Sequence, residues 1–202
     1  MTQHTTHLNT FFDDSTIHNS KLNTPVRALL ISVQIVTFIY SFFIFIPQGV
    51  CAIWYVNDTS TSGDVYTSAV GSNAQSGTST APFLTITKAL ISASPGDSVF
   101  IDSGTFNEYL YIDTAFLTLI GVDSNSTILI SPGDSSTSGL ATVGASRCTG
   151  VLIKNLSLTN GKYGVYFEGV NSSVITSCKI YGNHTTGIYI ENFFSSPKVY
   201  LS

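Results

Sequence analysis

Short runs of alternating apolar and polar residues recur at a fixed interval in the second half of the chain. The first copy of this unit covers residues 151–168, and the second covers residues 174–191. Five landmarks of the first copy return at one constant interval, as Val151 and Val174, Asn160 and Asn183, Gly164 and Gly187, Tyr166 and Tyr189, and Glu168 and Glu191. Each copy holds two β-rich runs separated by a turn with asparagine or glycine. A fixed period of this length, built from short strands, predicts a solenoid.

Further short runs precede the repeat, and each is bounded by Gly, Pro, Asn, Asp or Ser. They cover residues 99–102, 109–112, 116–120, 127–130 and 140–143. A two-sheet sandwich would give a similar series of strands. The constant interval of the repeat favours the solenoid, as does the absence of two-residue Asn-Gly hairpin turns directly between strands. Residues 199–202 are typical of the opening strand of another coil, so we expect a C-terminally incomplete β-helix of four to five coils.

One segment has the pattern of an amphipathic helix. It begins after Thr85, which can cap it, and ends at Ser94, where a Pro-Gly pair stops it. A short strand over residues 54–57 and a loop over residues 57–82, dense in Ser, Thr, Gly and Asn, precede it. The first coil of a solenoid exposes an apolar cross-section and unpaired strand backbone. The helix is therefore placed to cap that end.

The same N-terminal part carries an ordered series of motifs. They are Tyr55-Val-Asn-Asp58, Gly71-Ser-Asn-Ala74, Gly77-Thr78, Ala81-Pro-Phe-Leu-Thr-Ile86, Ala89-Leu90, Pro95-Gly-Asp97 and Gly104-Thr-Phe106. Over about residues 54–202, the chain resembles right-handed parallel β-helix proteins of the pectin-lyase-like superfamily. The resemblance implies an all-β fold, a right-handed parallel β-helix with an N-terminal amphipathic capping helix. It implies no one activity, because this entry module precedes many different activities.

The pattern predicts four parts. They are a disordered tail over residues 1–27, a targeting region over 28–52, the N-terminal cap over 53–98 and the coils over 99–202. The targeting region holds an apolar run over 28–46 that has two interpretations. It is either a signal peptide, cleaved before Ile53, or a membrane anchor of about 19 apolar residues, which would just span a bilayer. Both place the rest of the chain outside the cytoplasm, in the extracellular space or at the cell surface.

Composition narrows the class of partner. Charged residues make up 10% of the chain, against about 25% in a typical soluble protein, and Ser, Thr, Asn and Gly take their place. Such a polar but uncharged surface suits a secreted β protein. The net charge is −4, and Arg147 is the sole arginine after residue 53. With no basic stripe to neutralise phosphates, we expect no nucleic-acid partner.

The three cysteines leave two interpretations open. Cys51 lies in the targeting region, and Cys148 and Cys178 could pair in an oxidising compartment. Alternatively, Cys178 takes the place of Leu156 in the preceding unit and is a small buried apolar residue. No CxxC or His/Cys spacing indicates a metal site, so we expect no such cofactor.

The repeat places one constellation on an outer face. If Val165, Phe167, Ile188 and Ile190 face inward, the alternate residues face outward, namely Tyr166, Glu168, Tyr189 and Glu191. Successive coils stack about 4.8 Å apart, so the tyrosines and the glutamates would each lie side by side. This arrangement suits a polysaccharide or cell-surface glycan, and the carboxylate pair could equally hold Ca²⁺. The simpler interpretation is ordinary solvent-facing strand residues.

Asn160 and Asn183 recur at the turn after the first strand of each copy. Asparagine tolerates left-handed backbone there and can hydrogen-bond along the stack, so we expect a structural ladder.

No recognisable catalytic set accompanies these residues. Family members that cleave pectin use a Ca²⁺-binding aspartate cluster and an arginine base, whereas Arg147 is alone and Asp113, Asp123 and Asp134 do not follow the repeat spacing. The first hypothesis is therefore a secreted or surface-exposed β-helix segment associated with carbohydrate, as a polysaccharide binder, adhesin or stalk. The alternative is the N-terminal portion of a polysaccharide lyase or glycoside hydrolase whose catalytic coils lie beyond residue 202.

Overall fold

The computed structural model of the chain describes residues 50–133, 141–191 and 199–202. The predicted tail over residues 1–27 and the apolar run over residues 28–46 lie outside the described part, so both stay predictions. Within the described part, no helix has the length and apolar character needed to cross a membrane.

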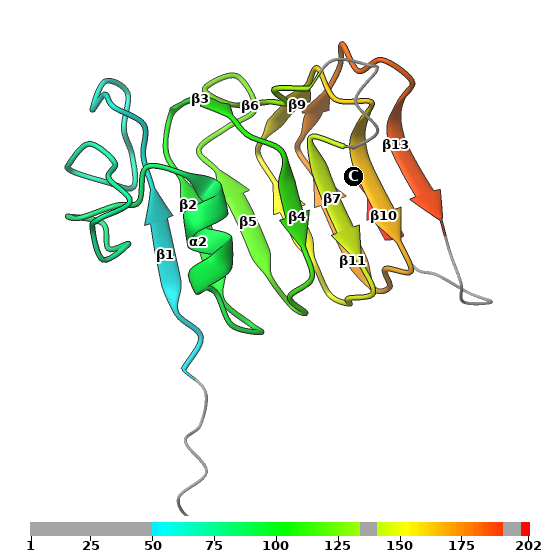
Figure 1. The fold of residues 1–202 in the computed structure, drawn as a ribbon, viewed down its shortest axis with the longest axis horizontal. Coiled ribbons are helices and arrows are strands. Elements are labelled where there is room, and N and C mark those ends of the chain that lie inside the picture. The colour runs from blue at the N-terminus through cyan, green and yellow to red at the C-terminus, as the bar shows by residue number, and fades with distance from the viewer. Residues whose placement is uncertain (1–49, 134–140, 192–198) are drawn as a thin grey trace, which may run out of the picture. The chain divides into compact units, whose positions relative to one another are not determined.

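The described strands form three sheets along one coil (Figure 1). One six-stranded sheet contains, in spatial order, β1 (Ile53–Val56), β2 (Ser98–Ile101), β5 (Thr118–Gly121), β8 (Leu152–Lys154), β11 (Ser173–Thr176) and β14 (Val199–Leu201). A second sheet, here called the β4–β13 sheet, contains β4 (Leu110–Ile112), β7 (Val143–Ser146), β10 (Tyr163–Glu168) and β13 (Thr186–Glu191). The third contains β3 (Gly104–Asn107), β6 (Thr127–Ile130), β9 (Ser157–Thr159) and β12 (Lys179–Ile180).

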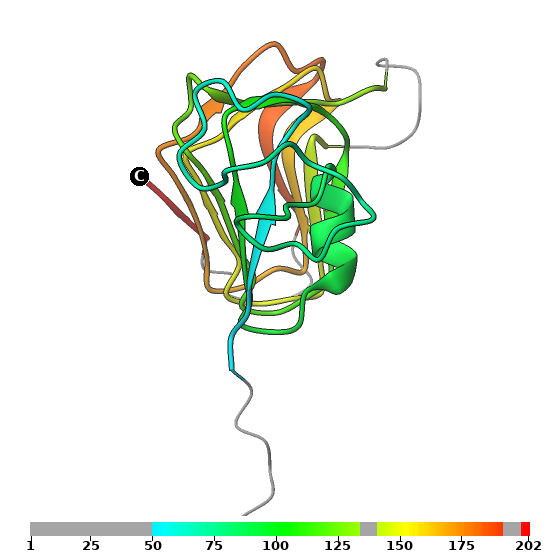
Figure 2. The ribbon, with the colours of Figure 1, turned by 90° about the vertical axis from the view of Figure 1, so that its left-hand side faces the viewer.

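All pairings between these strands are parallel. From β2 onward, each strand pairs with the strand three places later in the sequence, so one turn of the chain contributes one strand to each sheet. Figure 2, which views the coil from its β1 end, shows the chain winding around a single axis. The predicted parallel β-helix is confirmed, including β14 as the first strand of a further turn.

Inward side chains of successive turns pair in register and form the core. Three stacks follow the axis, namely Val99, Leu119, Ile153 and Ile175; Leu110, Val143, Val165 and Ile188; and Phe106, Leu129 and Leu158. Their members are at most 4% exposed apart from Ile188, which is half-buried in the last strand of its sheet. Burial of one such large side chain contributes about 1.5–3 kcal/mol.

The sequence pattern predicted one constant turn length, and this prediction is wrong in part. Tyr166 pairs with Tyr189 at the interval of the repeat, but the partner of Val174 is Leu152 rather than the predicted Val151. Val151 instead precedes β8 and is fully buried. One extra residue in the turn between β12 and β13 restores the longer interval. The strand predicted over residues 140–143 is also displaced, because β7 begins only at the last of these residues.

The predicted capping helix is α2 (Ile86–Ser92), which Figure 2 shows beside the first turns. The Thr85 hydroxyl oxygen accepts a hydrogen bond from the Lys88 backbone N–H at 3.2 Å, which confirms the N-cap. Ile86 and Ala89 are fully buried against the core. The helix contacts β1, β2 and β4, so it covers the apolar cross-section that a first turn would expose. It ends two residues earlier than predicted, at Ser92.

The long loop before α2 is held to the coil by hydrogen bonds. The buried Asp102 carboxylate accepts the backbone N–H groups of Val65, Tyr66 and Thr67 at 2.7–2.9 Å. Gly71 lies so close to the Asn57 carbonyl oxygen that a Cβ atom would clash with it, so only glycine fits. The loop is thus fixed by its own polar groups, as long structured loops require.

The three cysteines are free thiols. Cys148 is buried, and Cys178 is half-buried against the core as the predicted small apolar residue. Burial raises the pKa of both thiols, which keeps them in the neutral form.

Val165→Asp is expected to destabilise the fold by about 4 kcal/mol, because it places an unpaired charge between Val143 and Ile188. Thr105→Asp is the matched control, since Thr105 is exposed on β3 and should change stability by less than about 0.5 kcal/mol. Urea denaturation followed by circular dichroism measures both. A Val165→Asp protein as stable as the control would contradict the register.

Candidate functional site

The outward side of β10 and β13 carries the four residues predicted to form a site. Tyr166 pairs with Tyr189 and Glu168 with Glu191, so the structure places each pair on neighbouring strands. Between them, Phe167 is fully buried. Ile190, which was predicted to face inward, is 37% exposed, because β13 is the edge strand of its sheet in the described part of the chain. The alternation of strand side chains therefore separates a buried stack from an outer row of tyrosines and an outer row of glutamates.

A third tyrosine, which the repeat did not reveal, joins the pair. The rings of Tyr166 and Tyr189 stack with centroids 5.7 Å apart and an interplanar angle of 4°. Tyr163 stacks on both, at 5.6 and 5.0 Å. The Lys162 ammonium lies 5.3 Å from the centroid of the Tyr163 ring. Such mutual packing holds the rings in place, but it also occupies part of the ring faces.

Hydrogen bonds orient the two carboxylates. The Tyr166 hydroxyl donates to Glu191 at 2.8 Å, and the Ser146 hydroxyl donates to Glu168 at 3.2 Å. The hydrogen bond to Glu191 raises the pKa of Tyr166 to about 12, with smaller contributions from burial and from the negative charges of Glu191 and Glu168. The described residues contain no group of three or more His, Cys, Asp or Glu side chains that could hold a metal ion. A Ca²⁺ ion at this pair would need most of its six to eight oxygen ligands from elsewhere.

Asn160 and Asn183 each connect one turn to the turn before it. The Asn160 side-chain amide donates to the Ser131 carbonyl at 2.8 Å, and that of Asn183 donates to the Leu158 carbonyl at 3.2 Å. The two are not at equivalent positions, because the left-handed backbone of Asn160, with φ of 65°, corresponds to Gly182 at 61°. Their side chains bond to the backbone of the coil and lie at its turns.

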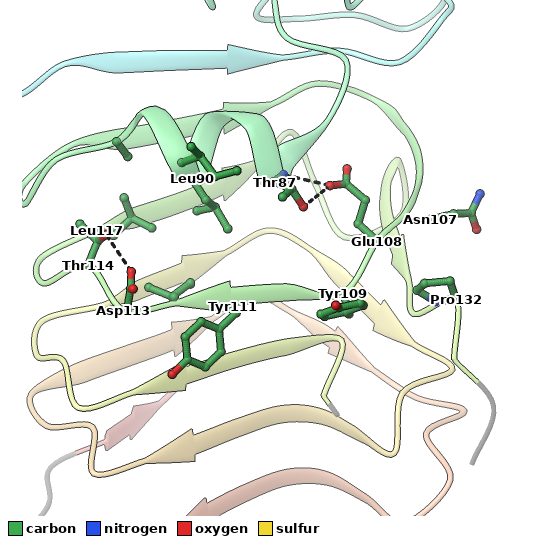
Figure 3. Close-up of a pocket in the computed structure, with 13 residues that line it drawn as sticks. Thr87, Leu90, Asn107, Glu108, Tyr109, Tyr111, Asp113, Thr114, Leu117 and Pro132 are labelled. Atoms are coloured by element: carbon green, nitrogen blue, oxygen red, sulfur yellow. Dashed lines mark hydrogen bonds between the residues drawn. The ribbon is translucent and has the colours of Figure 1, made fainter. Parts of the chain in front are cut away.

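A groove between α2 and β4 adds residues that the sequence did not single out (Figure 3). It encloses about 640 Å³. Tyr109 and Tyr111 line it from the strand side, and Asp113 lies at its end. On the helix side, the Glu108 carboxylate accepts the backbone N–H groups of Ile86 and Thr87, each at 2.9 Å. Glu108, in the turn between β3 and β4, thus joins the coil to the first turn of α2.

Replacement of Glu191 by Gln is expected to lower the pKa of Tyr166 toward its ordinary value of 10, because the neutral amide accepts the hydrogen bond without the charge. In the wild-type protein, stabilisation by this hydrogen bond is fully present below pH 10 and is lost as the pH rises toward 12. Phenolate absorbance during alkaline titration, with Tyr166→Phe as the reference, measures the shift. The same Tyr166 titration in both proteins would contradict the geometry.

Comparison with known families agrees with this architecture. A family model described as a right-handed beta helix region matches residues 68–200, which include α2 and every strand from β2 to β13. No curated protein matches the chain. The narrower resemblance to pectin-lyase-like proteins stays a prediction. The family match and the parallel sheets together show that this chain belongs to the right-handed β-helix family.

Proposed function

We propose that this β-helix is a polysaccharide-binding segment of a secreted or cell-surface protein, and that it contacts glycan through the outer side of the β4–β13 sheet. The observation that carries the proposal is the aromatic–carboxylate surface on β10 and β13. There, Tyr166 and Tyr189 stack with nearly parallel rings, and Glu191 accepts the Tyr166 hydroxyl. Rings offer apolar area to the C–H faces of sugars, and carboxylates accept hydrogen bonds from sugar hydroxyls.

The rigidity of this surface supports the proposal. A side chain that is already held in one rotamer loses little conformational entropy on binding. Tyr166 is held by two neighbouring rings and one hydrogen bond, and it sits on a strand whose other side is fully buried. Tyr189 remains 40% exposed, so it can still contact a ligand.

We also propose that the protein is exported from the cytoplasm. The apolar run over residues 28–46 supports export, as a signal peptide or as an anchor. The low content of charged residues agrees with an extracellular surface rich in Ser, Thr and Asn.

The double variant Tyr166→Ala, Tyr189→Ala is expected to keep the fold and to lower glycan affinity by at least about tenfold, because both rings lie outside the core. Tyr181→Ala is the matched control, since Tyr181 is 52% exposed and follows β12 in another sheet. The measurement is binding to a glycan array, followed by affinity electrophoresis with the polysaccharides that bind. Wild-type protein that binds no glycan, or a double variant that binds like wild type, would refute the proposal.

The segment is also expected to show no lyase activity on polygalacturonate. Arg147 is the sole arginine after residue 53, and it has no aspartate cluster at repeat spacing. Incubation with polygalacturonate and Ca²⁺, followed by absorbance of unsaturated product, tests this, with an active pectate lyase as the positive control. Product formation would favour the alternative of a polysaccharide-cleaving enzyme.

A further inference from the structure

The groove between α2 and β4 combines a buried apolar floor with an exposed aromatic rim. Ile112 and Leu117 in the floor are at most 1% exposed. At the rim, Tyr109 is 56% exposed, Tyr111 60% and Ile91 of α2 76%. An exposed set of large apolar side chains around one hollow is typical of a binding site, whereas such residues scattered singly need no explanation.

Tyr111 occupies a special position in this groove because its neighbour on β7 is Gly144. A Cβ atom added to Gly144 would lie 3.8 Å from Cδ2 of the Tyr111 ring, so the ring reaches over the glycine. Gly144 is accordingly buried, while the ring keeps 60% of its surface exposed. Figure 3 shows the open face of this ring beside β7. Tyr111 thus offers a ring face to solvent, unlike the mutually stacked rings of Tyr163, Tyr166 and Tyr189.

A carboxylate that can accept hydrogen bonds lies near Tyr111 in the sequence. Asp113 is two residues beyond Tyr111 and lines the same groove. Within the described part of the chain, its carboxylate accepts one long hydrogen bond, from the Thr114 hydroxyl at 3.4 Å. Most of its capacity to accept hydrogen bonds is therefore available to a ligand. An aromatic face beside a carboxylate matches the alternating C–H and hydroxyl groups of a sugar ring.

A row of outward positions connects Tyr111 to the stacked tyrosines. Tyr111, Gly144, Tyr166 and Tyr189 are successive register partners on β4, β7, β10 and β13. They form one row that crosses the sheet over three strand spacings, or about 14 Å. A linear polymer lying parallel to the coil axis would contact the groove at one end of the row and the stacked tyrosines at the other.

Charge narrows the class of polymer. The groove contains the carboxylates of Glu108 and Asp113, and none of its lining residues is lysine or arginine. The stacked tyrosines are flanked by two further carboxylates, Glu168 and Glu191, and by one ammonium group, that of Lys162 at the Tyr163 ring. Carboxylates therefore predominate along the row. A polyuronate chain would bring like charges onto this row, which costs free energy and slows association.

We propose that a linear, neutral polysaccharide binds along this row and that the α2–β4 groove is a sugar-binding subsite. One sugar ring stacks on the face of Tyr111 and donates a hydroxyl hydrogen bond to Asp113. The subsite rests on the proposed function, because it assigns the same outer face to glycan binding, and it adds its position and the class of glycan.

The experiment compares variants of the groove in affinity electrophoresis and isothermal titration, with a neutral polysaccharide that binds the wild-type chain. Tyr111→Ala is expected to weaken binding about tenfold, because the stacking face is lost. Tyr111→Phe should retain wild-type affinity, because the face remains. Asp113→Asn should weaken binding less than Tyr111→Ala, since the amide oxygen still accepts a hydrogen bond. Tyr181→Ala serves again as the exposed control.

Gly144 supplies a second, independent test. Gly144→Ala should bind like wild type, because the added Cβ meets its neighbours at 3.7–4.0 Å, an ordinary contact distance. Gly144→Val should weaken binding, because its branches displace the Tyr111 ring. Thermal melts of each variant show whether the fold is kept, and Tyr111→Ala decides the question if Gly144→Val does not fold.

The outcomes separate this subsite from the proposed function. Loss of binding in the Tyr166/Tyr189 double variant but not in Tyr111→Ala would overturn the subsite alone. Wild-type protein that binds no glycan would overturn both. Polygalacturonate bound as tightly as the neutral polysaccharide would overturn the assignment to neutral polysaccharides. Much weaker binding of polygalacturonate at low salt supports that assignment.

Discussion

The in-register stacking of inward side chains between successive turns is the interaction on which the rest of the structure depends. It fixes Val143, Val165 and Ile188 above one another, each in a parallel strand. Because strand side chains alternate, the same register also aligns the outward residues. The stacked rings of Tyr166 and Tyr189 are therefore a direct consequence of core packing, and their positions relative to one another are set by the most buried part of the molecule.

The open end of such a stack has to be covered, and here the cover also shapes the surface. α2 buries Ile86 and Ala89 against the first turns, and Glu108 links the start of the helix to the turn between β3 and β4. The helix is thicker than a strand, so it rises beside the β4–β13 sheet and leaves a groove along β4. One element thus protects the core and forms a wall of the groove.

The sequence predicted the fold and part of the site, for a physical reason. Identical residues recur where two turns have equal length, and this made the Tyr166–Tyr189 and Glu168–Glu191 pairs visible. Tyr111 has no such signal, because its neighbour on β7 is Gly144 rather than a tyrosine. The complete turn of the coil that leads from β4 through β5 and β6 to β7 also contains more residues than the repeat. A change of interval within a single turn of the coil similarly hid the true partner of Val174. Local turn lengths decide these registers, and they follow backbone geometry that no periodic pattern encodes.

The two parts of the tyrosine row differ in what they can contribute to binding. Tyr166 is held firmly by its neighbours, but stacking covers part of its ring. Tyr111 has a free face because β7 presents only Gly144 beneath it. A glycine within a strand costs about 0.5–1 kcal/mol relative to alanine, and nothing in its backbone conformation requires glycine here, since its φ is not in the left-handed region. An alanine Cβ would still meet the ring at an ordinary 3.8 Å, so the ring requires only a side chain no larger than that of alanine at this position. With so small a residue beneath it, Tyr111 is the residue most directly available to a ligand.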